Sequence, residues 1–255
     1  MRVNSKKIIF LLIICVLYAN SSYSWNISYV VKKNFFKIGT YSQLKATKYK
    51  HFPIIIHMVL LDFGKYSASL EVQDKNAISS VMEVSLKHNA LLAVNGGYYR
   101  EKFLPNGLLV YKGVIRSNLV FNNLLEGIVS ISELGELNLY KRKNKHIKAK
   151  YAFQTGPILN INGKPYNSNS TMLRQRSAIV QFKNKDIAIL SFSPVSLNDM
   201  SRLINRIATL INLQVKLALN LDGGLASSFV VNFQYYPVIL PEYKPVKSII
   251  MFKER

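Results

Sequence analysis

Two short apolar runs in this chain end in the same way, with polar residues followed by two glycines. Residues 90–94 lead into Asn95, Gly96 and Gly97, and residues 215–219 lead into Asn220, Leu221, Asp222, Gly223 and Gly224. Runs of this length and composition predict buried strands. Glycines at the end of a strand leave room for the backbone to approach a ligand. The sequence therefore predicts one site built from two loops at strand ends.

The rest of the chain alternates strand-like segments with turns and contains two segments of helical periodicity. The other expected strands are residues 54–63, 68–72, 107–111, 127–131, 136–140, 177–182, 187–192 and 246–252. The expected helices are residues 76–88, with Asp74 as N-cap, and 198–213. We expect hairpins at the turns 64–65, 134–135 and 183–186, and a polar lid at 160–171. This order predicts an α+β fold with a mixed, mostly antiparallel β-sheet and two main helices in a single domain.

The N-terminus has the pattern of a secretion signal. Arg2, Lys6 and Lys7 precede an apolar run at residues 8–17 that is short for a membrane span. We expect a signal peptide at 1–24 and one domain at 25–255, with its motif core at about 54–253; an uncleaved anchor is the alternative. Cys15, the only cysteine, lies in this segment, so the mature chain has no disulfide. The expected location is periplasmic or secreted.

The formal net charge of +21 favours anionic partners. We expect an anionic glycan or glycolipid substrate and peripheral contact with an anionic membrane surface. Six of the ten residues at 141–150 are Lys or Arg; they fit either a solvated loop or a binding patch. No nucleic acid is expected, because no helix-turn-helix, zinc-finger or aromatic-basic signature is present.

Four blocks carry a resemblance to a known family. They are Asn95 to Tyr99 with Pro105 to Val110, Gln154 to Leu159, Arg176 to Ala178, and Leu221 to Gly224 with Ser227. In this order and spacing the chain resembles the phosphodiester glycosidase family over most of its length after residue 59. Three positions depart from the family pattern. Leu225 stands where the family has a third glycine, Ala226 replaces its first serine, and Arg100 stands where family members often carry an acidic or small residue.

The resemblance implies hydrolysis of a sugar-1-phosphodiester between the anomeric carbon and the phosphate oxygen. Asp222 would attack or stabilise the anomeric carbon, and Arg176 would grip the phosphodiester. Glu101 is a candidate second carboxylate or an exposed loop residue. The expected substrate-binding residues are Asn95, Gly96, Gly97, Gln154, Thr155, Gly156, Gly223, Gly224 and Ser227. A departing phosphomonoester, with a second pKa near ~6, needs little proton donation.

Two other functional classes fit the same residues. One is a non-catalytic envelope protein that binds phosphoglycans through the glycine loops, and the other is a basic membrane-surface protein. No metal or cofactor is expected, because the four histidines lack ligand spacing and no phosphate-binding P-loop occurs. His57, within an expected strand, is interpreted as structural.

Overall fold

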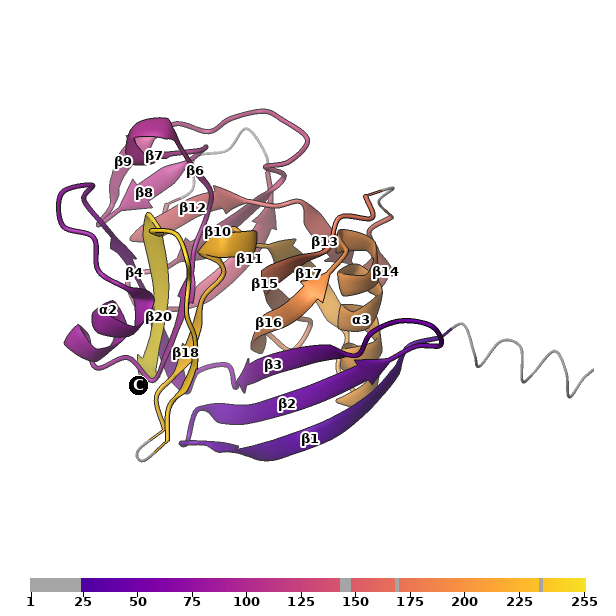
Figure 1. Ribbon diagram of the computed structural model, residues 1–255. Helices are drawn as coiled ribbons and strands as arrows, with labels where there is room; N and C mark the ends of the chain where they lie inside the picture. Colours follow the sequence, from indigo (N-terminus) through magenta and orange to yellow (C-terminus); the bar gives the residue numbers. More distant parts are fainter. Residues whose placement is uncertain (1–23, 143–147, 168–169, 234–235) are drawn as a thin grey trace, which may run out of the picture.

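The computed structural model describes residues 24–142, 148–167, 170–233 and 236–255 (Figure 1). The largest sheet has eight strands, in the order β1 (Asn26–Phe35), β2 (Gly39–Thr47), β3 (Ile54–Leu61), β16 (Ile187–Val195), β15 (Arg174–Phe182), β17 (Val215–Asn220), β13 (Ile158–Ile161) and β14 (Lys164–Pro165). All of its pairs are antiparallel.

Two five-stranded sheets complete the β-structure. One has the order β11 (Leu137–Lys141), β10 (Gly127–Ile131), β12 (Tyr151–Thr155), β8 (Leu109–Tyr111) and β9 (Val114–Ser117). The other has the order β19 (Val238–Leu240), β18 (Phe229–Val231), β5 (Leu92–Asn95), β20 (Ser248–Glu254) and β4 (Tyr66–Val72). A short ribbon pairs β6 (Tyr99–Arg100) with β7 (Leu104–Pro105). These pairs are also antiparallel, which confirms the mostly antiparallel class.

Two helices cover the sheets, as expected. Helix α3 (Leu197–Leu210) packs on one face of the eight-stranded sheet, with Met200, Leu203, Ile204 and Ile207 buried. The opposite face of that sheet and the two smaller sheets share the main core. Helix α2 (Val81–Lys87) packs on the sheet that contains β5. Two 3₁₀ turns, η1 (Glu101–Phe103) and η2 (Gly224–Ala226), follow the two glycine loops.

Several local predictions are confirmed and others are wrong. The hairpins β10–β11 and β15–β16 form as expected. However, β3 and β4 do not pair, because β3 lies between β2 and β16 whereas β4 pairs with β20. Helix α2 begins after Ser80, not Asp74, because Ser80 and Glu83 form a reciprocal capping box. None of the helices in the described ranges has the length and apolar character needed to cross a membrane.

Candidate functional site

The candidate site lies where β15 and β17 run side by side in the large sheet. Ala178 of β15 pairs with Asn220 of β17. Arg176 lies two residues before Ala178 in β15, and Asp222 lies two residues beyond the end of β17. The Leu221 N–H donates to the Ser177 carbonyl at 2.9 Å, so the chain still runs beside β15 at this point. The predicted acid and the predicted guanidinium therefore lie on adjacent segments at this end of the sheet.

Asp222 is fixed through its own backbone and is only partly buried. Its N–H donates to the Gly96 carbonyl at 3.1 Å, and its carbonyl accepts from the Asn95 amide at 2.7 Å. The Gly223 N–H donates to the carboxylate Oδ1 at 2.8 Å. Burial raises the pKa of the Asp222 carboxyl from 3.8 to about 6, and the Gly223 hydrogen bond partly opposes this. Carboxyl groups with a pKa moved toward neutrality are typical of active sites.

Arg176 is oriented by backbone carbonyls. Its Nε donates to Val195 at 2.9 Å and its Nη2 to Met172 at 3.2 Å. Within the described ranges no ion pair joins Arg176 to an acidic side chain. Burial is the main cause that lowers the pKa of the guanidinium. An oriented and unpaired cation of this kind is suited to bind an anion.

A second arginine, Arg174, was not predicted as a site residue. A Cβ atom placed on Gly224 would lie 3.8 Å from its Nη1, so this exposed guanidinium lies beside the loop that follows Asp222. Its charge also lowers the pKa of Arg176. The sequence signal was present, because two arginines at alternate positions of a strand share a face.

Tyr98 belongs to the first glycine loop and reaches the residues of the second. Its hydroxyl donates to the Gly156 carbonyl at 2.8 Å and accepts from the Asn220 amide at 2.6 Å. Burial raises the pKa of Tyr98, the charge of Asp222 raises it further, and Arg176 lowers it. Tyr98 therefore lies close to both charged groups and joins the two loops.

Asn95 connects three segments around Asp222. Its side chain is fully buried. The amide nitrogen donates to the Asp222 carbonyl, and Oδ1 accepts from the Ser177 hydroxyl at 2.8 Å and the Ser228 N–H at 3.0 Å. A side chain enclosed in this way has no exposed surface for a substrate, so we assign Asn95 a positioning role.

Residues 154–156, which were predicted to contact the substrate, instead make hydrogen bonds to other parts of the protein. The buried Gln154 amide binds backbone groups of three loop residues, Leu108, Val120 and Leu125. The Thr155 hydroxyl donates to the Asn220 carbonyl at 2.7 Å, and the Gly156 carbonyl accepts from Tyr98. These three residues hold the loops and β17 in place.

Three of the four glycines in these loops have a local reason to be glycine: Gly96 and Gly97 lack space for a Cβ atom, and Gly224 has a positive φ. A Cβ on Gly96 would lie 2.4 Å from a serine oxygen, and one on Gly97 would lie 2.8 Å from an aromatic carbon. Of the four, only Gly224 has a positive φ, of +65°. A backbone conformation that favours glycine therefore occurs at Gly224 alone among these four. Within the described residues, the N–H groups of Gly97 and Gly224 have no hydrogen-bond partner, whereas Gly96 and Gly223 are bonded.

The remaining predicted residues lie at the margins of the site. Ser227 is buried, and its Oγ has no hydrogen-bond partner among the described residues. Glu101 is exposed on η1, and no contact within the described ranges links it to Asp222.

His57 forms a hydrogen bond between its Nδ1 and the Tyr41 hydroxyl at 2.8 Å inside the large sheet. Within the ranges that the structure describes, no three His, Cys, Asp or Glu side chains gather as a metal site.

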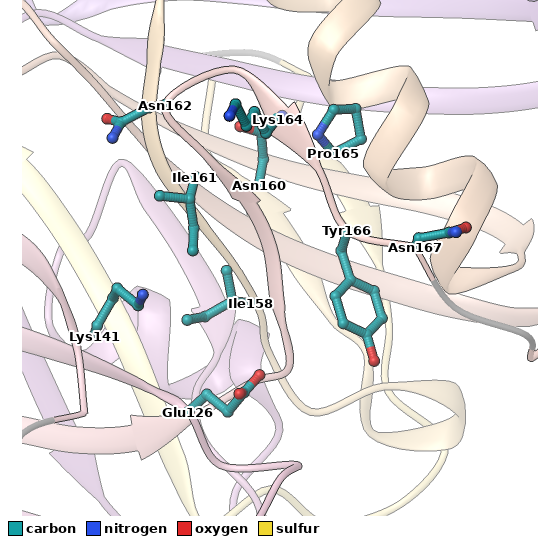
Figure 2. A pocket seen from close by; sticks show the side chains of 10 residues that line it. All are labelled: Glu126, Lys141, Ile158, Asn160, Ile161, Asn162, Lys164, Pro165, Tyr166 and Asn167. Atoms are coloured by element: carbon teal, nitrogen blue, oxygen red, sulfur yellow. The ribbon is translucent and has the colours of Figure 1, made fainter.

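A pocket of about 600 Å³ opens at the β13–β14 hairpin (Figure 2). It is lined by Glu126, Lys141, Ile158, Asn160, Ile161, Asn162, Lys164, Pro165, Tyr166 and Asn167. Lys141 and Glu126 lie on one side of it, with Tyr166 and Asn167 on the other. Ile158 pairs with Leu219, three residues before Asp222 on the same chain segment. Neither Asp222 nor Arg176 is among the residues that line the pocket.

Two predicted loops fall around this pocket. The first part of the expected lid at 160–171 forms the end of β13 and β14, and residues 168–169 lie outside the described ranges. In the basic run at 141–150, Lys141 lines the pocket. Arg142 donates to the carbonyls of Val120, Asn122 and Leu125. Residues 143–147 lie outside the described ranges.

Comparison with solved structures identifies the fold. The catalytic domain of zebrafish N-acetylglucosamine-1-phosphodiester alpha-N-acetylglucosaminidase, auto-inhibited by its pro-peptide, matches with a TM-score of 0.60 at 14% identity; the match covers 91% of this chain and 83% of that one. A hypothetical protein from Synechocystis matches with a TM-score of 0.62 at 12% identity, over 92% of this chain and 68% of that one. A putative exported protein from Burkholderia pseudomallei matches with a TM-score of 0.52 at 11% identity, and the match covers 93% of this chain and 87% of that one.

The family assignment comes from the sequence model of a protein family. No curated protein sequence matches the chain. The phosphodiester glycosidase model matches residues 88–253, which include both glycine loops, Arg176 and Asp222. This confirms the resemblance noted from the four blocks. The chain belongs to the phosphodiester glycosidase family.

Proposed function

We propose that this protein hydrolyses the bond between a sugar's anomeric carbon and the phosphate oxygen of a sugar-1-phosphodiester. The observation that carries this proposal is that Asp222 and Arg176 lie on adjacent segments where β15 and β17 meet the end of the large sheet. One group is a carboxyl with a raised pKa, and the other is a cation without an acidic partner in the described ranges. A sugar phosphodiester offers the complement of each, an electrophilic carbon and an anion.

Asp222 acts in its ionised form. At neutral pH a carboxyl with a pKa of about 6 is mostly deprotonated. Its negative charge faces the positive charge that develops at the anomeric carbon as the carbon–oxygen bond breaks. The electron pair of that bond leaves on the phosphate oxygen, and water supplies the hydroxyl of the free sugar.

Arg176 holds the phosphate before and after bond cleavage. Two of its guanidinium nitrogens are already fixed by carbonyls at 2.9 and 3.2 Å, so the group needs little reorganisation to bind an anion. Arg174 and the N–H groups of Gly97 and Gly224 add further positive potential near the same point. Charge stabilisation of this kind replaces a general acid, because a phosphomonoester is a good leaving group. The mechanism therefore needs no role for Glu101.

We infer that the pocket at the β13–β14 hairpin receives the part of the substrate beyond the scissile bond. Its volume of about 600 Å³ is within the range of small-ligand sites. Amide side chains, a tyrosine, two lysines and the single carboxylate of Glu126 line it, and this combination, with an excess of positive charge, suits a hydroxylated, anionic ligand. Together with the net charge of +21, it favours an anionic glycan or glycolipid of the cell envelope, reached after export.

The test is incubation of the purified protein with a panel of sugar-1-phosphodiesters that differ in the sugar and in the alcohol on the phosphate. We expect free sugar and phosphomonoester in equal amounts, and no cleavage of matched alkyl glycosides that lack phosphate. Tight binding of the diesters without any release of sugar would instead favour a non-catalytic phosphoglycan-binding protein.

A further inference from the structure

The loop between β2 and β3 presents aromatic and basic side chains directly to solvent. We call residues Lys48, Tyr49, Lys50, His51 and Phe52 the entry loop. Phe52 is 94% exposed and Tyr49 is 68% exposed. Burial of aromatic side chains is normally favourable, and no acidic residue occurs in the loop. The loop thus combines an unburied apolar tip with local positive charge.

The chain enters the described fold at this same loop. Trp25 packs against His51 with ring centroids 5.7 Å apart, and the Lys48 ammonium lies 5.6 Å from the Trp25 ring. The Trp25 indole donates to Asp199 near the start of α3 at 3.1 Å, which fixes this corner to the body of the protein. Figure 1 shows the β2–β3 connection beside the point where the chain enters.

The segment that precedes Trp25 has the composition of a membrane-directed sequence. Its apolar run at 8–17 follows three basic residues, Arg2, Lys6 and Lys7. This segment joins the described fold just before Trp25, which packs on the entry loop. The entry loop therefore lies next to the point where a membrane-directed segment joins the fold.

We propose that the entry loop docks on the surface of an anionic lipid bilayer. Aromatic side chains of this kind prefer the boundary between headgroups and acyl chains, and lysines bind the anionic headgroups above it. The net charge of +21 draws the whole protein to the same surface. This inference does not depend on the proposed catalytic activity, and a protein partner on the loop is the competing outcome.

A tryptophan placed at the tip of the loop tests the proposal. Phe52→Trp is compared with Leu134→Trp, because Leu134 is 73% exposed in the β10–β11 turn. Each variant is mixed with phosphatidylglycerol vesicles that contain brominated lipid. We expect the added tryptophan at position 52 to shift to shorter wavelength and to be quenched, and the one at 134 to remain unchanged. Equal behaviour of the two variants, with or without bromine, contradicts the proposal and favours a protein partner.

The lysines are tested in the Phe52→Trp background. Lys48→Gln with Lys50→Gln is compared with Lys183→Gln and Lys185→Gln in the β15–β16 turn. Each lysine at an anionic surface contributes about 1 kcal/mol, so losing two should raise the lipid concentration for half-maximal quenching about 30-fold. The control pair should change it by less than about threefold, which is the range of weak long-range attraction. An equal change in both pairs, or strong quenching on purely zwitterionic vesicles, overturns the assignment to anionic lipid.

Discussion

The two glycine loops have similar sequences but differ in what they expose. In the first, Asn95 is fully buried, and both the nitrogen and the oxygen of its side-chain amide make hydrogen bonds. In the second, Asp222 is only partly buried, and its carboxyl has a pKa raised to about 6. The first loop supports the second, because the Asn95 amide and the Gly96 carbonyl bind the Asp222 backbone. A shared motif therefore performs two tasks, positioning in one loop and chemistry in the other.

Asp222→Asn should abolish catalysis by the second glycine loop and leave the structure of the first glycine loop intact. The substitution keeps the shape and removes the charge that faces the anomeric carbon. We expect sugar release from a cleavable phosphodiester to fall by about 10³-fold or more, as for loss of a principal catalytic group. The thermal transition of the variant serves as the folding control. A loss smaller than tenfold would move the chemistry to another residue.

Asn95→Ala should destabilise the first glycine loop and its contacts with the Asp222 segment. It leaves the Asp222 carbonyl, the Ser177 hydroxyl and the Ser228 N–H without their partner in a buried region. Each such group costs about 1–3 kcal/mol, so we expect the free energy of unfolding to fall by about 3–4 kcal/mol. Urea denaturation measures this change. Glu101→Ala, at an exposed position, should change it by less than about 0.5 kcal/mol.

Arg176→Lys should weaken the grip on the phosphate and keep the positive charge. A lysine has no planar fork and cannot bind Val195, Met172 and a phosphate in the same geometry. We expect kcat/KM to fall about 100-fold, measured by release of phosphomonoester. Arg174→Lys, at an exposed position, should cost less than tenfold. Near-normal turnover by Arg176→Lys would refute its proposed role.

Asp222→Asn should also stabilise the fold. The folded pKa lies above the value of 3.8, so ionisation of Asp222 favours the unfolded chain. The free-energy cost of ionising Asp222 in the folded state is absent well below pH 4, grows as the pH rises, and reaches its full value above about pH 6. We expect the variant to gain about 2 kcal/mol in free energy of unfolding at pH 7. Urea denaturation across this range should show the gain disappear toward pH 4; a gain that stays constant with pH would have another cause.

Much of the sheet could be predicted from the sequence, because clear apolar runs and turn residues mark β10, β11, β15, β16 and β17. The strands β1 and β2 were missed. Nearly all of β1 is exposed on both faces, so it lacks the apolar alternation by which a strand is recognised. The wrong pairing of β3 with β4 has a different cause, since a turn at 64–65 does not reveal that the chain passes into another sheet.

The site could be predicted in part. Asp222 and Arg176 were identified from their motifs, and they lie on adjacent segments at one end of the large sheet. The sequence could not distinguish a buried amide from one that faces a ligand, so Asn95 and Gln154 were expected to bind substrate. Their hydrogen bonds run to residues between 29 and 133 positions away, and such long-range partners are not encoded in a local pattern.

The pH dependence of kcat/KM for a cleavable sugar-1-phosphodiester tests the central claim most directly. If ionised Asp222 performs the chemistry, kcat/KM should rise about tenfold per pH unit below about pH 6 and level off above it. A profile that is flat from about pH 4.5 to 8, or one that falls as the pH rises through 6, would contradict a catalytic role for the ionised Asp222 carboxylate.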